Sequence, residues 1–233
     1  MNASTISISS HDGKSFDGYL SLPPKGRGPG LLILQEIWGV NEHIRAVADQ
    51  YAMDGYVVIA PDVFWRQQPR VDLGYDEEGS KQARNFMMNL DAPNTVLDLQ
   101  AAANALRARP EVDGKVGAVG YCMGGRLAYA VAATGSIDAA VCYYGGRIQD
   151  NLSVASAITV PILFHYAEQD QHIPMSAVDT VKAAFAGRNN AQFHVYPGAD
   201  HGFNCWGRPM YHQRTAALAR GRTLQWLAEN MGG

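Results

Sequence analysis

The segment VGAVGYCMGG, at positions 116–125, constrains the fold of this chain more than any other. A short apolar run ends at Cys122, with glycines two residues before it and two and three residues after it. This pattern is typical of a strand, a sharp turn and a helix start that hold a nucleophile above a sheet in a strained backbone conformation. Glycine is needed wherever a Cβ in this turn would collide with the neighbouring strand or helix. The sequence therefore predicts a nucleophile elbow with cysteine in place of the usual serine.

A free cysteine is most often a small buried hydrophobe, so the elbow pattern needs support from the rest of the chain. Asp170 follows an apolar strand that starts at Pro161, and His201 follows the strand and turn QFHVYPGAD. Nucleophile, acid and histidine thus occur in the order that the α/β-hydrolase architecture uses. Both residues follow predicted parallel strands, at the sheet edge where catalytic groups collect. Asp200 is the alternative acid, but side chains of adjacent residues project in different directions, so we favour Asp170.

The alternation of apolar and amphipathic segments predicts an α/β-hydrolase fold: a mostly parallel sheet, helices on both faces, and an N-terminal antiparallel hairpin. The expected strands are 5–9, 16–22, 31–35, 56–62, 116–120, 139–144, 161–167 and 192–196. The expected helices are 42–53, capped by Asn41, and 79–90, 94–109, 123–134, 175–187 and 209–230. Residues 63–78 carry Pro, Gly and charge without a period, and so long an excursion often shapes a pocket. No linker interrupts the alternation, so residues 1–233 are expected to form a single domain.

Composition excludes several classes of function. The net charge is −3 and Lys and Arg do not cluster, which argues against a nucleic-acid partner. No segment approaches the roughly 18 uninterrupted apolar residues of a membrane span, and the N-terminus lacks the features of a secretory signal. These patterns predict a cytoplasmic protein without a membrane partner, either a monomer or a small homo-oligomer.

Cysteine and histidine spacing predicts neither a disulfide framework nor a metal or other cofactor. The three cysteines are an odd number and form no CxxC pair. His165, His172 and His194 show no paired ligand spacing. Cys142 lies in an apolar strand and is expected to be part of the core.

The remaining residues of the predicted site follow from the chemistry of a cysteine nucleophile, which reacts as the thiolate. His201 is the candidate base, and Asp170 would fix its tautomer and orientation. The backbone amides of Met123 and Ile37 are the candidate oxyanion donors, one after the nucleophile and one after the strand LLILQ. Glu36 follows that strand directly, where it is either a partly solvated loop acid or a carboxylate that contacts Cys122 in the resting state and modulates its ionisation.

Several segments together resemble the dienelactone hydrolase family over essentially the whole chain. They are QEIWGVNEHIR (35–45), GYVVIAPD (55–62), KVGAVGYCMGGRLA (115–128), YYG (143–145), the QD of 169–170, and GADHGF (198–203). The resemblance implies a single-domain α/β-hydrolase. It implies Cys122 as nucleophile, His201 as base, Asp170 as orienting acid, and Glu36 as the carboxylate that deprotonates or holds the thiol until substrate displaces it.

The chain departs from this family at two positions that bind substrate. Well-studied members use two arginines to grip the substrate carboxylate, and an ungapped alignment places Ser80 and Cys205 at those positions. Arg84, one helical turn after Ser80, and Arg208, in the loop after His201, are the candidate replacements. Three further residues are expected to line an apolar pocket, namely Trp38, Tyr144 and Phe203.

The sequence thus predicts a hydrolase of small carboxylic esters or lactones that works through a thioester acyl-enzyme on Cys122. Acyl transfer to an acceptor other than water and hydrolysis of neutral esters are alternatives on the same scaffold. A thiol redox sensor without turnover is an alternative of another class, because a sensor needs only an accessible thiol of low pKa.

Overall fold

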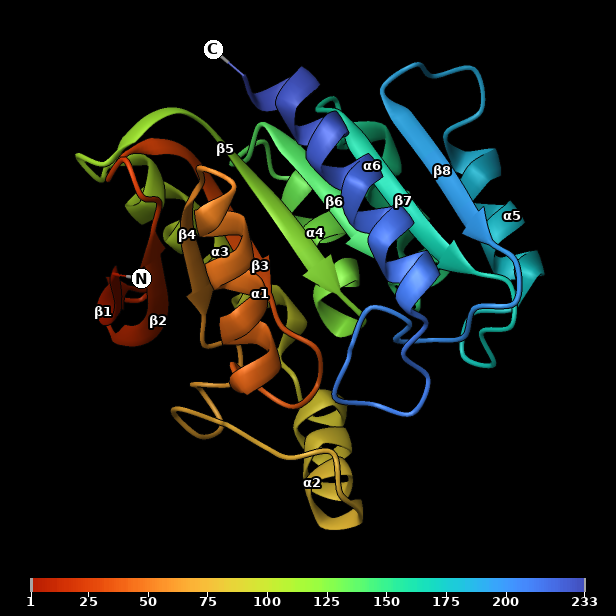
Figure 1. The fold of residues 1–233 in the computed structure, drawn as a ribbon, viewed down its shortest axis with the longest axis horizontal. Helices are drawn as coiled ribbons and strands as arrows, with labels where there is room; N and C mark the ends of the chain where they lie inside the picture. The colour runs from red at the N-terminus through yellow and green to blue at the C-terminus, as the bar shows by residue number, and fades with distance from the viewer. Residues whose placement is uncertain (1, 233) are drawn as a thin grey trace.

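A computed structural model describes residues 2–232, which form one eight-stranded sheet with helices on both faces (Figure 1). The strands are β1 (Asn2–Ser9), β2 (Ser15–Leu22), β3 (Gly28–Leu34), β4 (Val57–Pro61), β5 (Val112–Tyr121), β6 (Ala139–Tyr143), β7 (Ile162–Ala167) and β8 (Ala191–Tyr196). The helices are α1 (Glu42–Met53), α2 (Glu77–Met88), α3 (Ala92–Arg107), α4 (Met123–Ala132), the 3₁₀ segment η1 (Ile148–Ala157), α5 (Met175–Ala184) and α6 (Gln213–Met231).

The strand order β1-β2-β4-β3-β5-β6-β7-β8 confirms the predicted architecture. The hairpin β1–β2 is antiparallel and forms one edge, and β2 pairs antiparallel with β4. The remaining strand pairs are parallel. Helices α1 and α6 cover one face, and α3, α4 and α5 cover the other (Figure 1). Because both faces are covered, β4 and β6 are buried along their whole length, which explains their continuous apolar sequences.

Helix starts follow the predicted capping chemistry. The side chain of Asn41 accepts a hydrogen bond from the amide of Ile44 at 3.2 Å, as expected for the cap of α1. Asp76 and Asp91 cap α2 and α3 in the same way. No helix within residues 2–232 is both long enough and apolar enough to cross a lipid bilayer.

Several bounds differ from the sequence prediction: β5 starts at Val112 instead of residue 116, and two helical segments differ as well. The η1 segment has no predicted counterpart, and it contains a kink at Asn151 where two short helical turns meet. The last helix begins at Gln213 instead of residue 209, because the preceding residues form a chain of tight turns. In that chain the amides of Cys205 and Arg208 donate to the carbonyls of Gly202 and Cys205, at 2.9 and 3.1 Å. These turns prevent a continuous α-helix from starting before Gln213.

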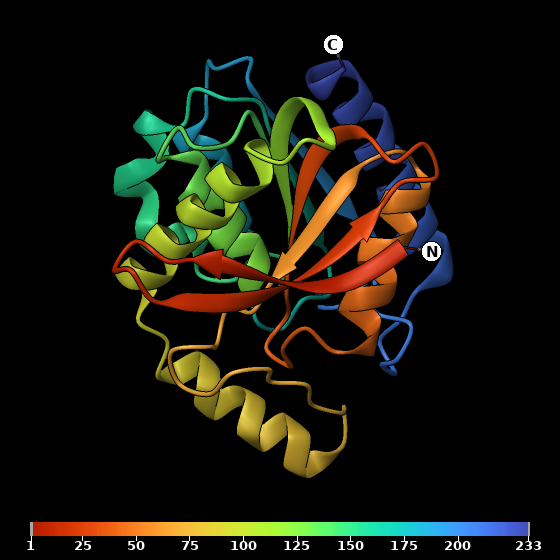
Figure 2. The ribbon, with the colours of Figure 1, turned by 90° about the vertical axis from the view of Figure 1, so that its left-hand side faces the viewer.

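The excursion between β4 and α2 covers the loop that follows β3. The amide of Leu73 donates to the carbonyl of Trp38 at 3.0 Å, and the side chain of Asn41 donates to the carbonyl of Leu73 at 3.2 Å. Helix α2 itself lies apart from the helices that pack on the sheet (Figure 2). This segment therefore shapes the surroundings of residues 36–41, at the carboxyl end of β3.

Candidate active site

The turn between β5 and α4 has the geometry of a nucleophile elbow. Cys122 has φ 55° and ψ −116°, and its amide donates to the carbonyl of Tyr143 at 3.0 Å. A Cβ at Gly120 would collide with the carbonyl of Gly124. A Cβ at Gly124 would lie 2.6 Å from the Gln35 carbonyl oxygen and closer still to the backbone of Leu34. The two glycines thus let α4 start directly against the end of β3, and they leave Cys122 partly exposed at the helix N-terminus.

Asp170 and His201 meet at the carboxyl ends of β7 and β8. The Nδ1 atom of His201 lies 2.7 Å from Oδ2 of Asp170, and both side chains are buried. The other oxygen of Asp170 accepts from the amides of His172 and Ile173, at 2.8 and 3.0 Å. The alternative acid, Asp200, instead accepts from the backbone amide of His201 at 2.6 Å. The structure therefore pairs the imidazole with Asp170.

The ionisation of His201 depends on Cys122. Burial lowers the pKa of His201, but the negative charge of a Cys122 thiolate and the hydrogen bonds with Asp170 and Cys122 raise it more, giving a pKa of about 10. The raised pKa favours the protonated form of the His201 ring at neutral pH.

The amides of Ile37 and Met123 lie on the two segments that the elbow brings together. Gly124 packs against the backbone of Leu34 and Gln35, so the start of α4 lies beside the start of the loop that contains Ile37. The Gln35 side chain anchors this loop by accepting from the amide of Val63 at 3.2 Å. Neither predicted oxyanion amide donates a hydrogen bond to another residue of the described chain. Both are thus available to a ligand.

Glu36 is buried, with 1% of its surface exposed, and it faces Arg208. Its Oε1 forms an ion pair with Nη1 of Arg208 at 3.5 Å, and neither oxygen has a hydrogen-bond partner among the described residues. Burial raises the pKa of Glu36, and the positive charges of Arg208 and His201 oppose that shift. No hydrogen bond in residues 2–232 joins Glu36 to Cys122. The structure thus places this carboxylate against the guanidinium instead of the nucleophile.

The two candidate arginines lie in different environments. Arg208 is largely buried, with 12% of its side chain exposed, and its guanidinium stacks 4.5 Å from the centre of the Trp38 ring. Arg84 is exposed on α2 and lines a shallow groove with residues such as Glu78 and Lys81. Ser80 faces the loop instead, since its Oγ accepts from Nε1 of Trp38 at 3.4 Å. The structure therefore brings Arg208, and not Arg84, together with Glu36.

Of the predicted aromatic lining residues, Tyr144 lies beside the histidine. Its ring centre is 5.1 Å from that of His201, and its buried hydroxyl has no hydrogen-bond partner within the described chain. Phe203 is fully buried and packs edge-on against Tyr144 at 5.1 Å, so it supports the site from the core. Trp38 is also buried and forms the floor on which Arg208 rests.

Two residues that sequence reasoning did not select, Tyr75 and His43, also lie at this site. The hydroxyl of Tyr75 accepts from Sγ of Cys205 at 3.2 Å and from Nδ2 of Asn41 at 3.1 Å. His43 is buried with both ring nitrogens unpartnered, and burial together with Arg208 lowers its pKa to about 4. Tyr75 stands in no motif, and His43 lies in the segment 35–45 that carries the family resemblance but has no paired ligand spacing that would mark it as a site residue.

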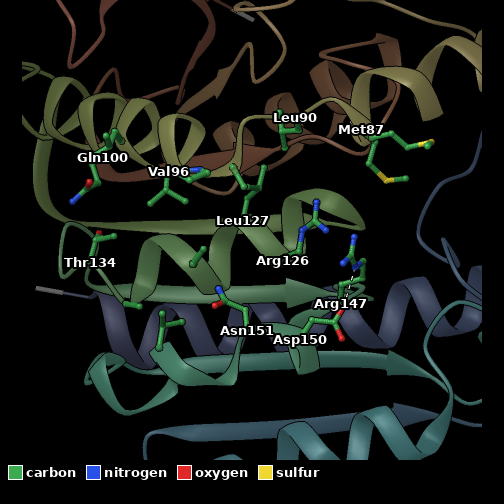
Figure 3. A pocket seen from close by; sticks show the side chains of 17 residues that line it. Met87, Leu90, Val96, Gln100, Arg126, Leu127, Thr134, Arg147, Asp150 and Asn151 are labelled. Atoms are coloured by element: carbon green, nitrogen blue, oxygen red, sulfur yellow. Dashed lines mark hydrogen bonds and ion pairs between the residues drawn. The ribbon is translucent and has the colours of Figure 1, made fainter.

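A separate cavity of about 1080 Å³ opens between α3, α4 and η1 (Figure 3). Its walls are largely apolar, and Arg126 and Arg147 extend into one end of it. Arg126 is one turn beyond Cys122 on α4, but none of the residues Glu36, Cys122, Asp170 and His201 lines this cavity. The cavity therefore lies beside the candidate site and is not part of it.

Comparisons with known proteins agree on one family. The model of the dienelactone hydrolase family matches residues 16–231. The carboxymethylenebutenolidase of Pseudomonas putida is 38% identical, over 96% of this chain and 95% of that protein. Carboxymethylenebutenolidase 1 of Cupriavidus pinatubonensis is 33% identical, again over 96% and 95%. The crystal structure of a Klebsiella pneumoniae protein classed with the dienelactone hydrolases is 30% identical, with a TM-score of 0.88 over 97% of this chain and 98% of that one.

Proposed function

The chain belongs to the dienelactone hydrolase family, and from this membership we propose that it hydrolyses small carboxylic esters or lactones through Cys122, His201 and Asp170. The observation that carries the proposal is the His201 ring, which is held by Asp170 at 2.7 Å and whose pKa is raised by Cys122 on its other side. An acid, an imidazole and a sulfur in series are the parts that nucleophilic catalysis requires.

In the proposed acylation step the Cys122 thiolate attacks the carbonyl carbon, and the negative charge moves to the carbonyl oxygen. The amides of Ile37 and Met123 would stabilise that oxyanion. When the tetrahedral intermediate collapses, the bond to the leaving oxygen breaks and protonated His201 donates its proton to that oxygen. Esters and lactones that release an enolate are favoured, because the enolate is a good leaving group.

In the proposed deacylation step His201 is neutral and removes a proton from water as the water attacks the thioester. Collapse of the second intermediate expels the Cys122 thiolate and regenerates protonated His201. Asp170 keeps the ring in the required orientation through both steps, because Nδ1 stays bonded to Oδ2.

Arg208 is the proposed anchor for a substrate carboxylate. Its guanidinium faces Glu36 at 3.5 Å without a hydrogen bond, so donors remain available for a bidentate contact with an incoming carboxylate. Such a substrate would take the place of Glu36 beside Arg208. Glu36 would then be free to move away from Arg208.

The experiment that tests the proposal compares a carboxylate-bearing dienelactone with neutral aryl esters as substrates. We expect Cys122→Ala to lower kcat/KM for any hydrolysed substrate by at least about 10³-fold, as loss of a triad nucleophile does. Cys142→Ala is the matched control, since Cys142 is fully buried in β6, and it should keep turnover. Mass spectrometry of a quenched reaction should detect the acyl group on Cys122.

The outcomes separate the alternatives. Turnover of neutral esters alone would agree with the proposed triad, and it would show that the substrates are neutral esters and not carboxylate-bearing lactones. Product formed on an added alcohol or thiol, in preference to free acid, would indicate acyl transfer. Absence of turnover with both substrates, together with peroxide oxidation of Cys122 that persists in His201→Ala, would replace the hydrolase proposal with a thiol redox sensor.

A further inference from the structure

We propose that Glu36, His43 and Cys205 form a binding site for a thiophilic divalent cation, with Zn²⁺ as the best match. Each residue offers one ligand atom, and the three atoms lie within 4.8 Å of one another. A carboxylate, an imidazole and a thiolate are ligands that zinc takes in proteins. The three residues come from the loop after β3, the first turn of α1 and the turns before α6, so only the folded chain brings them together.

The ligand atoms are buried and largely unpartnered. Glu36, His43 and Cys205 are 1%, 4% and 0% exposed. Both oxygens of Glu36 and both ring nitrogens of His43 lack hydrogen-bond partners in the described part of the chain. Buried polar atoms are normally satisfied, so four such atoms in one cluster require an explanation. A coordinated cation would satisfy one atom on each of the two residues.

Burial and the charge of Glu36 raise the pKa of Cys205 to about 12, so the thiolate would need the cation, with Tyr75 as its hydrogen-bond partner. In the structure Sγ donates to the hydroxyl of Tyr75 at 3.2 Å, and that hydroxyl also accepts from Asn41. On metal binding the thiol proton would pass to solvent and a metal–sulfur bond would form. The Tyr75 hydroxyl could then turn and donate to the sulfur, as outer partners of metal ligands commonly do. Tyr75 and Cys205 would thus share a hydrogen bond both in the metal-free thiol and in the metal-bound thiolate.

Charge and distance also fit the proposal. The thiolate and the carboxylate together balance the charge of Zn²⁺, and because the thiol proton leaves as the ion binds, the net charge beside Arg208, which lies 3.5 Å from Glu36, rises by one unit instead of two. Zinc bonds of about 2.0–2.3 Å hold tetrahedral ligand atoms roughly 3.5 Å apart. The side chains therefore need to move inward by only about 1 Å, and water can take the fourth position.

The site shares Glu36 with the proposed catalytic centre, and this consequence rests on the proposed function. A cation that holds Glu36 would keep it from exchanging with a substrate carboxylate at Arg208. Zn²⁺ should therefore inhibit hydrolysis reversibly, and a chelator should restore it. The binding site itself is tested without any measurement of activity.

The test is a titration of the chelator-treated, reduced protein with Co²⁺, whose bond to a thiolate gives a charge-transfer absorption band. We expect one equivalent of Co²⁺ to produce the band in the wild type and in Cys122→Ala, and no band in Cys205→Ser. His43→Gln should weaken Co²⁺ binding while His194→Gln leaves it unchanged. Tyr75→Phe should weaken it by about 10- to 100-fold. Circular dichroism would show that each variant is folded.

Two results would overturn the proposal. One is the absence of a charge-transfer band at any Co²⁺ concentration in the folded wild type. The other is a band that disappears in Cys122→Ala and persists in Cys205→Ser, which would place the ion on the nucleophile. If the Cys205-dependent band forms and Zn²⁺ leaves hydrolysis unaffected, the metal site stands and the role of Glu36 in catalysis fails.

Discussion

Arg208 contacts Glu36 from a position three residues beyond the one that aligns with the family's second arginine. The residue aligned with the family's second arginine is Cys205, whose side chain turns toward Tyr75 and away from solvent. Three residues later Arg208 reaches back over the Trp38 ring to Glu36. The tight turns that start at Gly202 make this possible, since they fold residues 201–208 back on themselves.

Replacement of Arg208 should therefore separate substrates by charge. We expect Arg208→Ala to raise KM for a carboxylate-bearing lactone by about tenfold or more, because a charge-assisted contact contributes roughly 1.5–3 kcal/mol. KM for neutral aryl esters should change little. Arg84→Ala is the matched control, since Arg84 is exposed on α2, and it should leave both KM values unchanged. Equal losses for both kinds of substrate in Arg208→Ala would remove Arg208 from carboxylate binding.

The protonation of His201 provides a second prediction at this scale. Because the charge of Cys122 raises the pKa of His201 to about 10, the ring should be protonated at pH 8 in the resting wild type. Removing the sulfur in Cys122→Ala removes that charge, so the pKa of His201 should fall. NMR titration of the ¹⁵N-labelled imidazole measures both values. An unchanged pKa in Cys122→Ala would show that Asp170 alone holds the proton.

At the scale of elements, the site depends on how closely α4 approaches β3. The first turn of α4 contacts the carbonyl ends of Leu34 and Gln35, and this contact places the Met123 amide near the Ile37 loop. Because the contact is between backbones, no side-chain rearrangement can relieve an added methyl group. The close approach of α4 to the end of β3 thus depends on the absence of a Cβ at Gly124.

Two glycine substitutions should have opposite effects on stability. Gly124→Ala adds a Cβ against the backbone of Leu34, and we expect it to lower the free energy of unfolding by about 1–3 kcal/mol and to reduce kcat. Gly221→Ala lies inside α6, where an added Cβ meets no atom within 4 Å, and it should raise that free energy by about 0.5–1 kcal/mol. Urea denaturation measures both. A stable, active Gly124→Ala would contradict the close approach.

At the scale of the whole molecule, one sheet runs from the first strand to the last, and a single buried core continues along it. We therefore expect residues 1–233 to unfold as one domain. Tryptophan fluorescence and far-UV circular dichroism should give coincident urea transitions, because Trp38 and Trp226 lie in loops and helices attached to the same sheet. Two separated transitions would indicate two independent folding units.

The sequence by itself determined the fold and the centre of the candidate site. Glycines around Cys122 and apolar runs before Asp170 and His201 are local patterns, and local sterics and burial translate such patterns directly into a turn or a strand end. Since parallel strands end at one edge of a sheet, knowing the strands was enough to bring these residues together.

Only the tertiary structure decided which side chains surround that centre. The meeting of Glu36 with Arg208, and of His43 with Cys205, depends on the paths of three separate loops. Loop paths follow from hydrogen bonds and packing between residues far apart in the chain, such as Leu73 with Trp38, and no period or motif records them. For the same reason the sequence did not distinguish Arg84 from Arg208 as the candidate for binding a substrate carboxylate, and in the folded chain only Arg208 lies beside Glu36.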